Sequence, residues 1–208
     1  MQYAMRVWHI MSLEISRAKE YVNWIARKVV LNHLATNAQS RQVRRGEVYW
    51  CEFGLNIGSE MSKDSPRPAI IIQNNQGNSK SSNTIVVPVT HDSGSGPYLV
   101  PIQTQYNADG SILLDGKANT SNMICVSKAR LSNYITKISS SDMKQIDKSI
   151  ANMICLMPYY YDMKKSRDEL RLKLLFAQEK LRQLSALLDS SDLDTYTVEK
   201  LRKIIDSQ

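Results

Sequence analysis

The chain has 208 residues, enough for one medium domain with appendages or two small domains, and its 42% hydrophobic content suits an ordinary globular core. No apolar run approaches the roughly 20 residues that span a bilayer, and Arg6 and His9 interrupt the N-terminal stretch, so we expect a cytoplasmic protein without a signal peptide. Cys51, Cys125 and Cys155 are too scattered for a zinc site, and we expect all three to be reduced and buried or half-buried.

The net charge of +7 is concentrated at the N-terminus. Residues 1–45 carry eight Lys or Arg against two Glu, whereas residues 46–160 carry nine of each sign and residues 161–208 carry ten basic and nine acidic side chains. This basic arm ends in Arg41, Arg44 and Arg45. Such an arm suits nucleic acid, DNA included, or an acidic protein partner. A solvated helix followed by a basic linker explains it equally well.

Residues 12–35 have the apolar spacing of an amphipathic helix. The stripe comprises Ile15, Ala18, Val22, Ile25 and Val29, and it continues to His33 or Leu34. It needs a partner, which could be the central domain, another helix or a second subunit. We expect Trp24 and His33 to be packing residues, and the polar residues 35–42 are typical of a linker.

The central region has many short strand patterns separated by turns. Residues 43–53 alternate, and 69–73 and 84–90 are continuous apolar runs, with Pro88 predicting an edge or a bulge. The segment 74–83 has turn and loop composition. Further strands are predicted at 98–102, 111–114, 122–126, 127–131 and 136–138, and then a helix capped by Ser139 or Ser141. This pattern predicts a mainly β, small barrel closed by one helix.

A second amphipathic segment covers residues 163–188. Leu170, Leu174, Ala177, Leu181, Leu184 and Leu188 alternate four and three apart, as in a coiled-coil heptad. The segment could pair with another helix or fold back onto the domain, and residues 197–205 could form a short final helix. We therefore predict three parts: a helical arm and linker at 1–42, a barrel domain at 43–157 and a helical extension at 158–208.

Five short motifs occur in order within the central region: RGEVY at 45–49, GSE at 58–60, RPAIIIQN at 67–74, PVT at 88–90 and KARL at 128–131. Together they resemble the MazF/PemK (Kid) family of toxin ribonucleases from bacterial toxin–antitoxin systems. The resemblance covers roughly residues 43–157. It implies an SH3-like barrel with a C-terminal helix, usually a homodimer. It also implies cleavage of single-stranded RNA without metal or cofactor, and neutralisation by an antitoxin.

The resemblance places the catalytic role on Arg67 and Thr90. In this chemistry the ribose 2′-hydroxyl attacks the adjacent phosphate, leaving a 2′,3′-cyclic phosphate and a 5′-hydroxyl. Arg67, held between Pro66 and Pro68, could stabilise the charge on the phosphoryl oxygens, and Thr90 could position the phosphate or the 2′-hydroxyl. The alternatives are a surface ion pair between Arg67 and Asp64, and an ordinary strand-end hydroxyl at Thr90.

Other polar residues of the region are weaker candidates. Some family members carry an acidic residue near the position of Ser127, which could serve as a base there. This chain lacks that carboxylate, so His91 or Glu60 is the candidate to act as acid or base in its place. Unpaired bases are read through hydrogen bonds to their edges, which suits amide and other polar side chains. The candidates for RNA contact are Ser59, Lys63, Gln73, Asn74 and Lys80.

Three functions stay open on the sequence alone. The first is an active endoribonuclease toxin. The second is a toxin-fold protein that inhibits a protein such as DNA gyrase, as CcdB-like barrels do. The third is a catalytically silent binding or regulatory module. One of the helical arms could also cover the RNA-binding surface of its own chain or strengthen a dimer.

Overall fold

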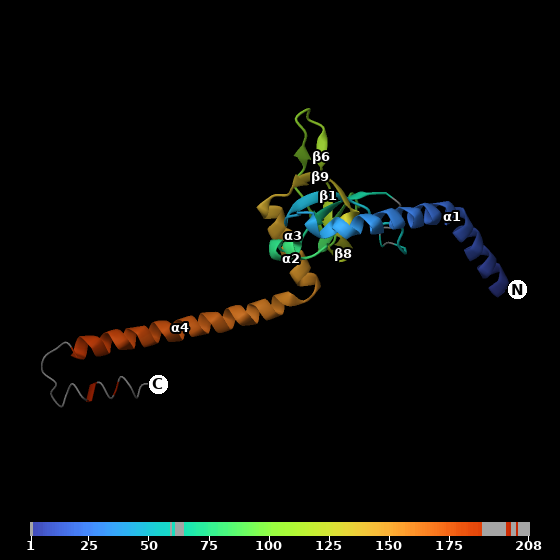
Figure 1. Cartoon of the computed structure of the whole chain (residues 1–208). Coiled ribbons are helices and arrows are strands. Elements are labelled where there is room, and N and C mark those ends of the chain that lie inside the picture. The colour runs from blue at the N-terminus through green and yellow to red at the C-terminus, as the bar shows by residue number, and fades with distance from the viewer. Residues whose placement is uncertain (1, 59, 61–64, 189–198, 201–202, 204–208) are drawn as a thin grey trace. The chain divides into compact units, whose positions relative to one another are not determined.

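The computed structural model describes residues 2–58, 60, 65–188, 199, 200 and 203, with the backbone alone at residues 2–17, 187 and 188. The chain divides into two compact units, Met1–Ile154 and Cys155–Gln208. The first unit holds every strand of the described chain (Figure 1). The three-part division predicted above, with boundaries at 42 and 157, stays a prediction.

The first unit is built on an antiparallel sheet. Its order is β4 (Leu99–Pro101), β7 (Lys117–Asn119), β3 (Asn83–Thr90), β2 (Arg67–Ile71), β1 (Glu47–Cys51) and β9 (Leu131–Lys137). A further strand, β8 (Ile124–Ser127), pairs with β3, and the short helix η3 (Lys128–Arg130) leads from it into β9. A separate hairpin joins β5 (Gln105–Tyr106) and β6 (Ile112–Leu114). The predicted mainly β, barrel-like fold with flanking helices is confirmed.

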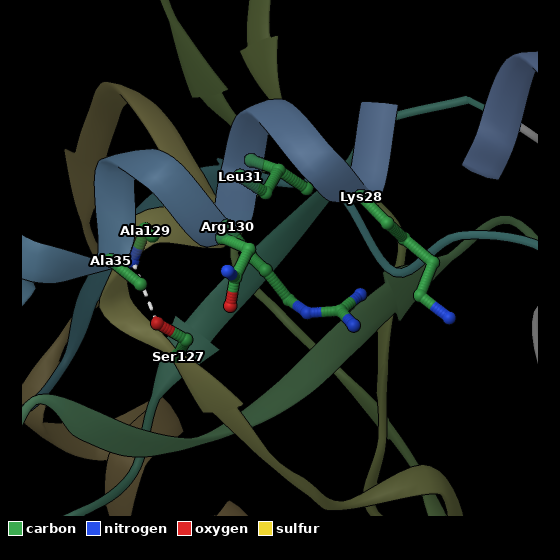
Figure 2. Close-up of a pocket in the computed structure, with 7 residues that line it drawn as sticks. Lys28, Leu31, Ala35, Ser127, Ala129 and Arg130 are labelled. Carbon is green, nitrogen blue, oxygen red and sulfur yellow. Dashed lines mark hydrogen bonds between the residues drawn. The ribbon is translucent and has the colours of Figure 1, made fainter. Parts of the chain in front are cut away.

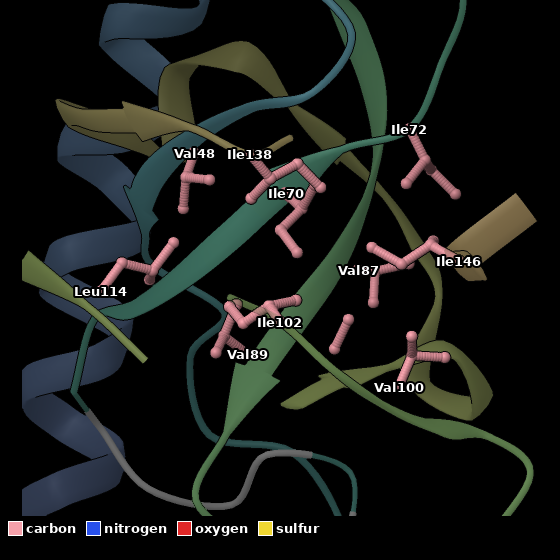
Figure 3. Close-up of a cluster of buried hydrophobic side chains, with 11 residues drawn as sticks. Val48, Ile70, Ile72, Val87, Val89, Val100, Ile102, Leu114, Ile138 and Ile146 are labelled. Atoms are coloured by element: carbon pink, nitrogen blue, oxygen red, sulfur yellow. The ribbon is translucent and has the colours of Figure 1, made fainter. Parts of the chain in front are cut away.

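The central strands are buried on both faces, which explains their continuous apolar runs. Ile70 and Val87, paired across β2 and β3, belong to a cluster with Val48 and with Ile146 of helix α3 (Ser140–Met153), shown in Figure 3. The neighbouring residues Ala69 and Ile71 belong to a second cluster on the opposite face. Because side chains alternate along a strand, each run of β2 and β3 supplies both clusters.

Pro88 lies where strand β3 changes its partner. Residues 83–86 of β3 pair with β8, whereas Val89 and Thr90 pair with β7. Proline has no backbone N–H to donate to a ladder, so it fits the gap between these two pairings. The expectation of an edge strand is therefore wrong for β3, which has partners on both sides.

Helix α3 begins at a predicted cap residue, and it packs on the first cluster. Ser139 accepts a hydrogen bond from the backbone N–H of Asp142 at 3.0 Å, the geometry of an N-cap. The buried hydroxyl of Ser149 donates to the carbonyl of Pro97 at 2.8 Å, and it lies 2.8 Å from the hydroxyl of Thr120 in η2 (Thr120–Asn122). These bonds attach the helix to the segment that precedes β4 and to the segment that follows β7.

The N-terminal helix α1 (Gln2–Leu34) packs on the sheet unit through a face other than the predicted one. Trp24 and Leu31 are buried, whereas Val22, Ile25 and Val29 are each more than 60% exposed. The predicted stripe is thus not the packing face in this unit. His33 is exposed, so the expectation that it packs is wrong. The predicted linker begins with the short helix η1 (Ala35–Ser40).

Two of the arginines that end the basic arm are engaged within the first unit. The guanidinium of Arg41 donates to the carbonyls of Leu131 and Ser132 and lies 5.4 Å from the ring centroid of Tyr49. Arg45 forms an ion pair with Asp147 of helix α3. These contacts favour a structural role for this part of the arm.

The second unit contains helix α4 (Leu156–Leu188), longer at its start than the predicted segment. Its described side chains are exposed along most of its length. The predicted final helix at 197–205 lies mostly outside the described residues. Among the helices of the described residues, none combines the length and the apolar content of a membrane-spanning segment.

The three thiols should differ in reactivity. Cys51 is fully buried, and burial raises its pKa to about 12, so its thiol stays protonated and shielded at neutral pH. Cys125 and Cys155 are exposed, which corrects the expectation that all three are buried or half-buried. We expect two thiols of the native chain to react rapidly with Ellman's reagent and the third only in denaturant. Rapid reaction of the Cys125→Ser, Cys155→Ser double variant would contradict this assignment.

Candidate active site

Arg67 and Thr90 come together at one end of the sheet. The pairing of β2 with β3 places Ala69 opposite Pro88. Arg67 and Thr90 each lie two residues beyond that pair on their own strands. Directly opposite residues of an antiparallel pair share a face, and this parity repeats every two residues. The side chains of Arg67 and Thr90 therefore leave the same face at the same end, an arrangement we name the Arg67–Thr90 site.

Arg67 is half-buried, and its guanidinium makes no hydrogen bond or ion pair with a described residue. Asp64, the alternative partner considered from the sequence, lies outside the described residues. Pro68 pairs opposite Trp50 in the ladder, and Pro66 precedes the strand, so the backbone on both sides of Arg67 is restricted. A restricted backbone carrying an arginine without a described partner suits the binding of an anion.

Thr90 ends strand β3 and begins a polar turn. Its hydroxyl accepts a hydrogen bond from the backbone N–H of Asp92 at 3.2 Å. On the other side, Thr90 pairs with Lys117 of β7, and the Lys117 ammonium donates to the carbonyls of Asp92 and Gly94 at 3.0 and 2.7 Å. The turn after Thr90 is thus attached to β7, and this attachment holds the hydroxyl in place. The hydroxyl can still donate a hydrogen bond to an oxygen of a ligand.

His91 is paired with a carboxylate. Its Nε2 lies 2.7 Å from Oδ1 of Asp115, and both side chains remain accessible, with 73% of the histidine exposed. A carboxylate on one ring nitrogen favours the tautomer that carries its proton there, which leaves the other nitrogen as an acceptor. The chain therefore offers an oriented imidazole next in sequence to Thr90.

Glu60 is exposed and lies at a separate pocket. The pocket has a volume of about 330 Å³ and is lined by Asn56, Glu60, Ser121, Asn122, Met123 and Ile124. Its amide side chains and two apolar residues suit a planar polar group. The structure shows no contact between Glu60 and Thr90, so His91 is the acid–base candidate with the better-defined geometry.

Three of the RNA-contact candidates, Gln73, Asn74 and Lys80, lie away from this site. Gln73 lies six residues along from Arg67, or about 20 Å on an extended strand, at the opposite end of β2. The segment predicted as turn and loop contains a short helix, α2 (Asn75–Lys80), in which the Asn74 side chain is occupied as the N-cap, accepting from the N–H of Gly77. Lys80 ends that helix. Ser59 and Lys63 lie outside the described residues.

Ser127 is also remote from Thr90. It pairs with Asn83 at the beginning of strand β3, seven residues before Thr90. Its hydroxyl accepts from the N–H of Ala129 at 3.3 Å, and it lines a pocket of about 210 Å³ with Lys28 and Leu31 of α1 (Figure 2). An acidic residue at this position would face helix α1, so its absence here removes no group from the Arg67–Thr90 site.

The KARL motif is structural in this chain. Lys128 is fully buried, and its ammonium donates to the carbonyl of Asn78 at 2.5 Å; desolvation lowers its pKa. Arg130 donates to the carbonyls of Glu52 and Phe53, both at 3.0 Å, and lies over the ring of Trp24. These contacts hold η3 against α2, against the segment that follows β1 and against α1.

Three neighbours of Thr90 were not singled out from the sequence: Asp115, Gly116 and Lys117. Asp115 and Gly116 form the turn between β6 and β7, and Lys117 begins β7, which pairs with β3 at Thr90. The only local signal is the sequence LDGK, a turn with glycine between two short apolar segments. Within the described part of the chain, no group of three His, Cys, Asp or Glu side chains could hold a metal ion.

Comparison with known proteins identifies the family. A family model described as "PemK-like, MazF-like toxin of type II toxin-antitoxin system" matches residues 44–154, which is more than half of the chain. The chain belongs to this PemK/MazF-like toxin family. The matched region begins just before β1 and ends with α3, so it contains the whole sheet and the Arg67–Thr90 site.

Individual relatives match a similar share of the chain. The chain is 28% identical over 122 residues to Endoribonuclease EndoA of Bacillus subtilis (strain 168), which covers 56% of this chain and 98% of that protein. A solved endoribonuclease in complex with its cognate antitoxin from Mycobacterial species is 23% identical, covering 55% of this chain and 96% of that one, with a TM-score of 0.44. MazF (Form-I) from Deinococcus radiodurans is 14% identical, covering 55% and 97%, with a TM-score of 0.47.

Proposed function

We propose that this PemK/MazF-like chain is an endoribonuclease toxin that cuts single-stranded RNA, including mRNA, without a metal ion. The observation that carries the proposal is the arrangement of Arg67 and Thr90 on one face at one end of the sheet, within the region matched by the family. A relative named as an endoribonuclease, aligned over nearly its whole length, supports the same activity.

In the proposed reaction the ribose 2′-oxygen forms a bond to the neighbouring phosphorus, and the bond from phosphorus to the 5′-oxygen breaks. The products are a 2′,3′-cyclic phosphate and a 5′-hydroxyl, so one proton leaves the 2′-hydroxyl and one reaches the departing 5′-oxygen. The transition state places added negative charge on the phosphoryl oxygens. The planar guanidinium of Arg67 can donate two charge-assisted hydrogen bonds to these oxygens.

Thr90 acts in this proposal by positioning. A hydroxyl with an ordinary pKa is a poor general base, but it can donate a hydrogen bond to the phosphate while the Asp92 N–H holds its oxygen in place. We assign to His91 the role of the base that accepts the proton of the 2′-hydroxyl, while Asp115 holds its Nε2. Glu60 is the alternative base, and a His91→Gln variant with undiminished cleavage would favour it.

The RNA contacts and partners follow from the same proposal. Gln73, Asn74 and Lys80 would touch only a strand of RNA long enough to reach the far end of β2. Ser59, Glu60 and Lys63, which precede Arg67 in the sequence, stay predicted RNA contacts. An antitoxin is the expected protein partner, a homodimer the expected assembly and the cytoplasm the expected compartment. Binding of DNA by the basic arm stays a prediction.

The activity can be tested directly on a long single-stranded RNA in the presence of EDTA. We expect discrete cuts that persist in the chelator, because the proposed chemistry uses only side chains. The 3′ ends should resist ligation until acid opens the cyclic phosphate and a phosphatase then removes the resulting monophosphate. The 5′ ends should accept phosphate from a kinase without prior dephosphorylation. Cleavage that stops in EDTA would contradict the mechanism. Absence of cleavage would favour the gyrase-inhibitor or silent-module alternatives.

A further inference from the structure

Helix α4, outside the region matched by the family, exposes an apolar seam. Leu170, Leu174 and Leu181 are 65%, 58% and 64% exposed. With Ala177 and Leu184 they occupy alternating four- and three-residue spacings, the a and d positions of a heptad. We refer to these five residues as the α4 seam. Leucines repeated along one face of a solvated helix are the pattern of a helix that pairs with another helix.

The charges that flank the α4 seam all have one sign. The e and g positions beside it hold Arg171, Lys173 and Lys180, together with the uncharged Gln178 and Ser185. The acidic residues of this stretch occupy outer positions, where Asp168 is paired with Arg167 and Glu179 with Arg182. In paired helices the e and g residues lie against those of the partner and select it by charge.

A second copy of α4 would not match these flanks. In a parallel pair, Lys173 would meet Gln178 and Lys180 would meet Ser185, so no opposite charges would come together. In an antiparallel pair, e positions face e positions and g positions face g positions. Arg171 would then meet only e residues and Lys173 and Lys180 only g residues of the other copy, and no acidic side chain would lie opposite any of them. Acidic flanks on a partner would instead place an opposite charge beside each basic residue.

We propose that the α4 seam binds an amphipathic helix of another protein, with apolar a and d positions flanked by Glu or Asp at e and g. Leu172, Leu175 and Phe176, outside the seam, are also more than half exposed, so the proposal rests on the heptad spacing of the seam and on the sign of its flanks. It is independent of the RNA-cleavage proposal. The binding surface lies in the unit Cys155–Gln208, separate from the unit that carries the Arg67–Thr90 site.

Two synthetic peptides of three heptads test this with the full-length chain. Both carry Leu at a and d; one has Glu and the other Lys at every e and g position. By fluorescence anisotropy at low salt, we expect the Glu peptide to bind more tightly by about tenfold, since several flanking ion pairs add. Arg171→Glu with Lys173→Glu should reverse the preference, and Leu174→Asp should abolish binding.

A matched pair of substitutions on the outer positions provides the control. Lys165→Glu with Arg182→Glu changes the net charge by the same amount but lies off the flanks, so the preference for the Glu peptide should persist. Equal binding of both peptides, or loss of preference in this control, would overturn the proposal. So would a dimer of the chain that Leu174→Asp converts to a monomer, because the seam would then bind a second copy.

Discussion

Replacing Arg67 with alanine should reduce RNA cleavage by about 10²–10³-fold, the loss typical of removing one preorganised donor to a charged transition state. The guanidinium of this half-buried residue has no partner among the described residues, so its removal breaks no described ion pair and leaves no carboxylate unpaired there. We therefore expect little change in thermal stability. Single-turnover cleavage rates with saturating RNA, measured beside a thermal melt, separate the two effects.

Two variants make this test specific. Arg67→Lys keeps the charge but loses the planar pair of donors, so it should recover only part of the rate. Arg182→Ala removes an exposed arginine from α4, where its partner is Glu179, and should cleave as the parent chain does. Cleavage by Arg67→Ala within about threefold of the parent, well below the loss of one oxyanion donor, would exclude Arg67 as the stabilising residue.

The fold was predictable where local chemistry and pattern agree. The strands β2 and β3, the cap of α3 at Ser139 and the helical conformation of α4 depend on neighbouring residues, and the structure reproduces them. Helix α2 was missed because its sequence of Asn, Gln, Gly and Ser is typical of turns, and it begins with an asparagine cap. The packing face of α1 was mistaken because Trp24 and Leu31 are buried against segments distant in sequence.

The candidate site was predictable only in part, for the same reason. Motif likeness singled out Arg67 and Thr90, and strand pairing places them together. Asp115, Gly116 and Lys117 were not predicted, because their proximity to Thr90 depends on the pairing of β3 with β7. Gln73 and Asn74 follow Arg67 closely in sequence, yet an extended strand carries them to the opposite end of the sheet.

Gly116 lies close against the backbone of Thr90. Its φ is +107°, a backbone conformation that L side chains rarely adopt. A Cβ atom at this position would lie 2.6 Å from the carbonyl oxygen of Thr90, far inside van der Waals contact, and 3.4 Å from Cδ2 of His91. The obstructing atom belongs to the backbone, so relief requires movement of strand β3 at Thr90 or of the turn that carries Asp115.

Gly116→Ala should therefore lower cleavage by roughly tenfold to hundredfold while the protein remains folded, because displacement of reacting groups by about 1 Å costs up to 10²-fold in rate. Gly110→Ala is the matched control: Gly110 has a φ of +82°, but a Cβ there meets nothing within 4 Å. Both variants carry the backbone penalty of about 1–2 kcal/mol for a left-handed residue, so both should melt at a lower temperature. Only Gly116→Ala should lose activity when rates are compared well below either melting point. Equal loss in the two variants would attribute the effect to stability, and full activity in Gly116→Ala would show that cleavage does not depend on the position of Thr90.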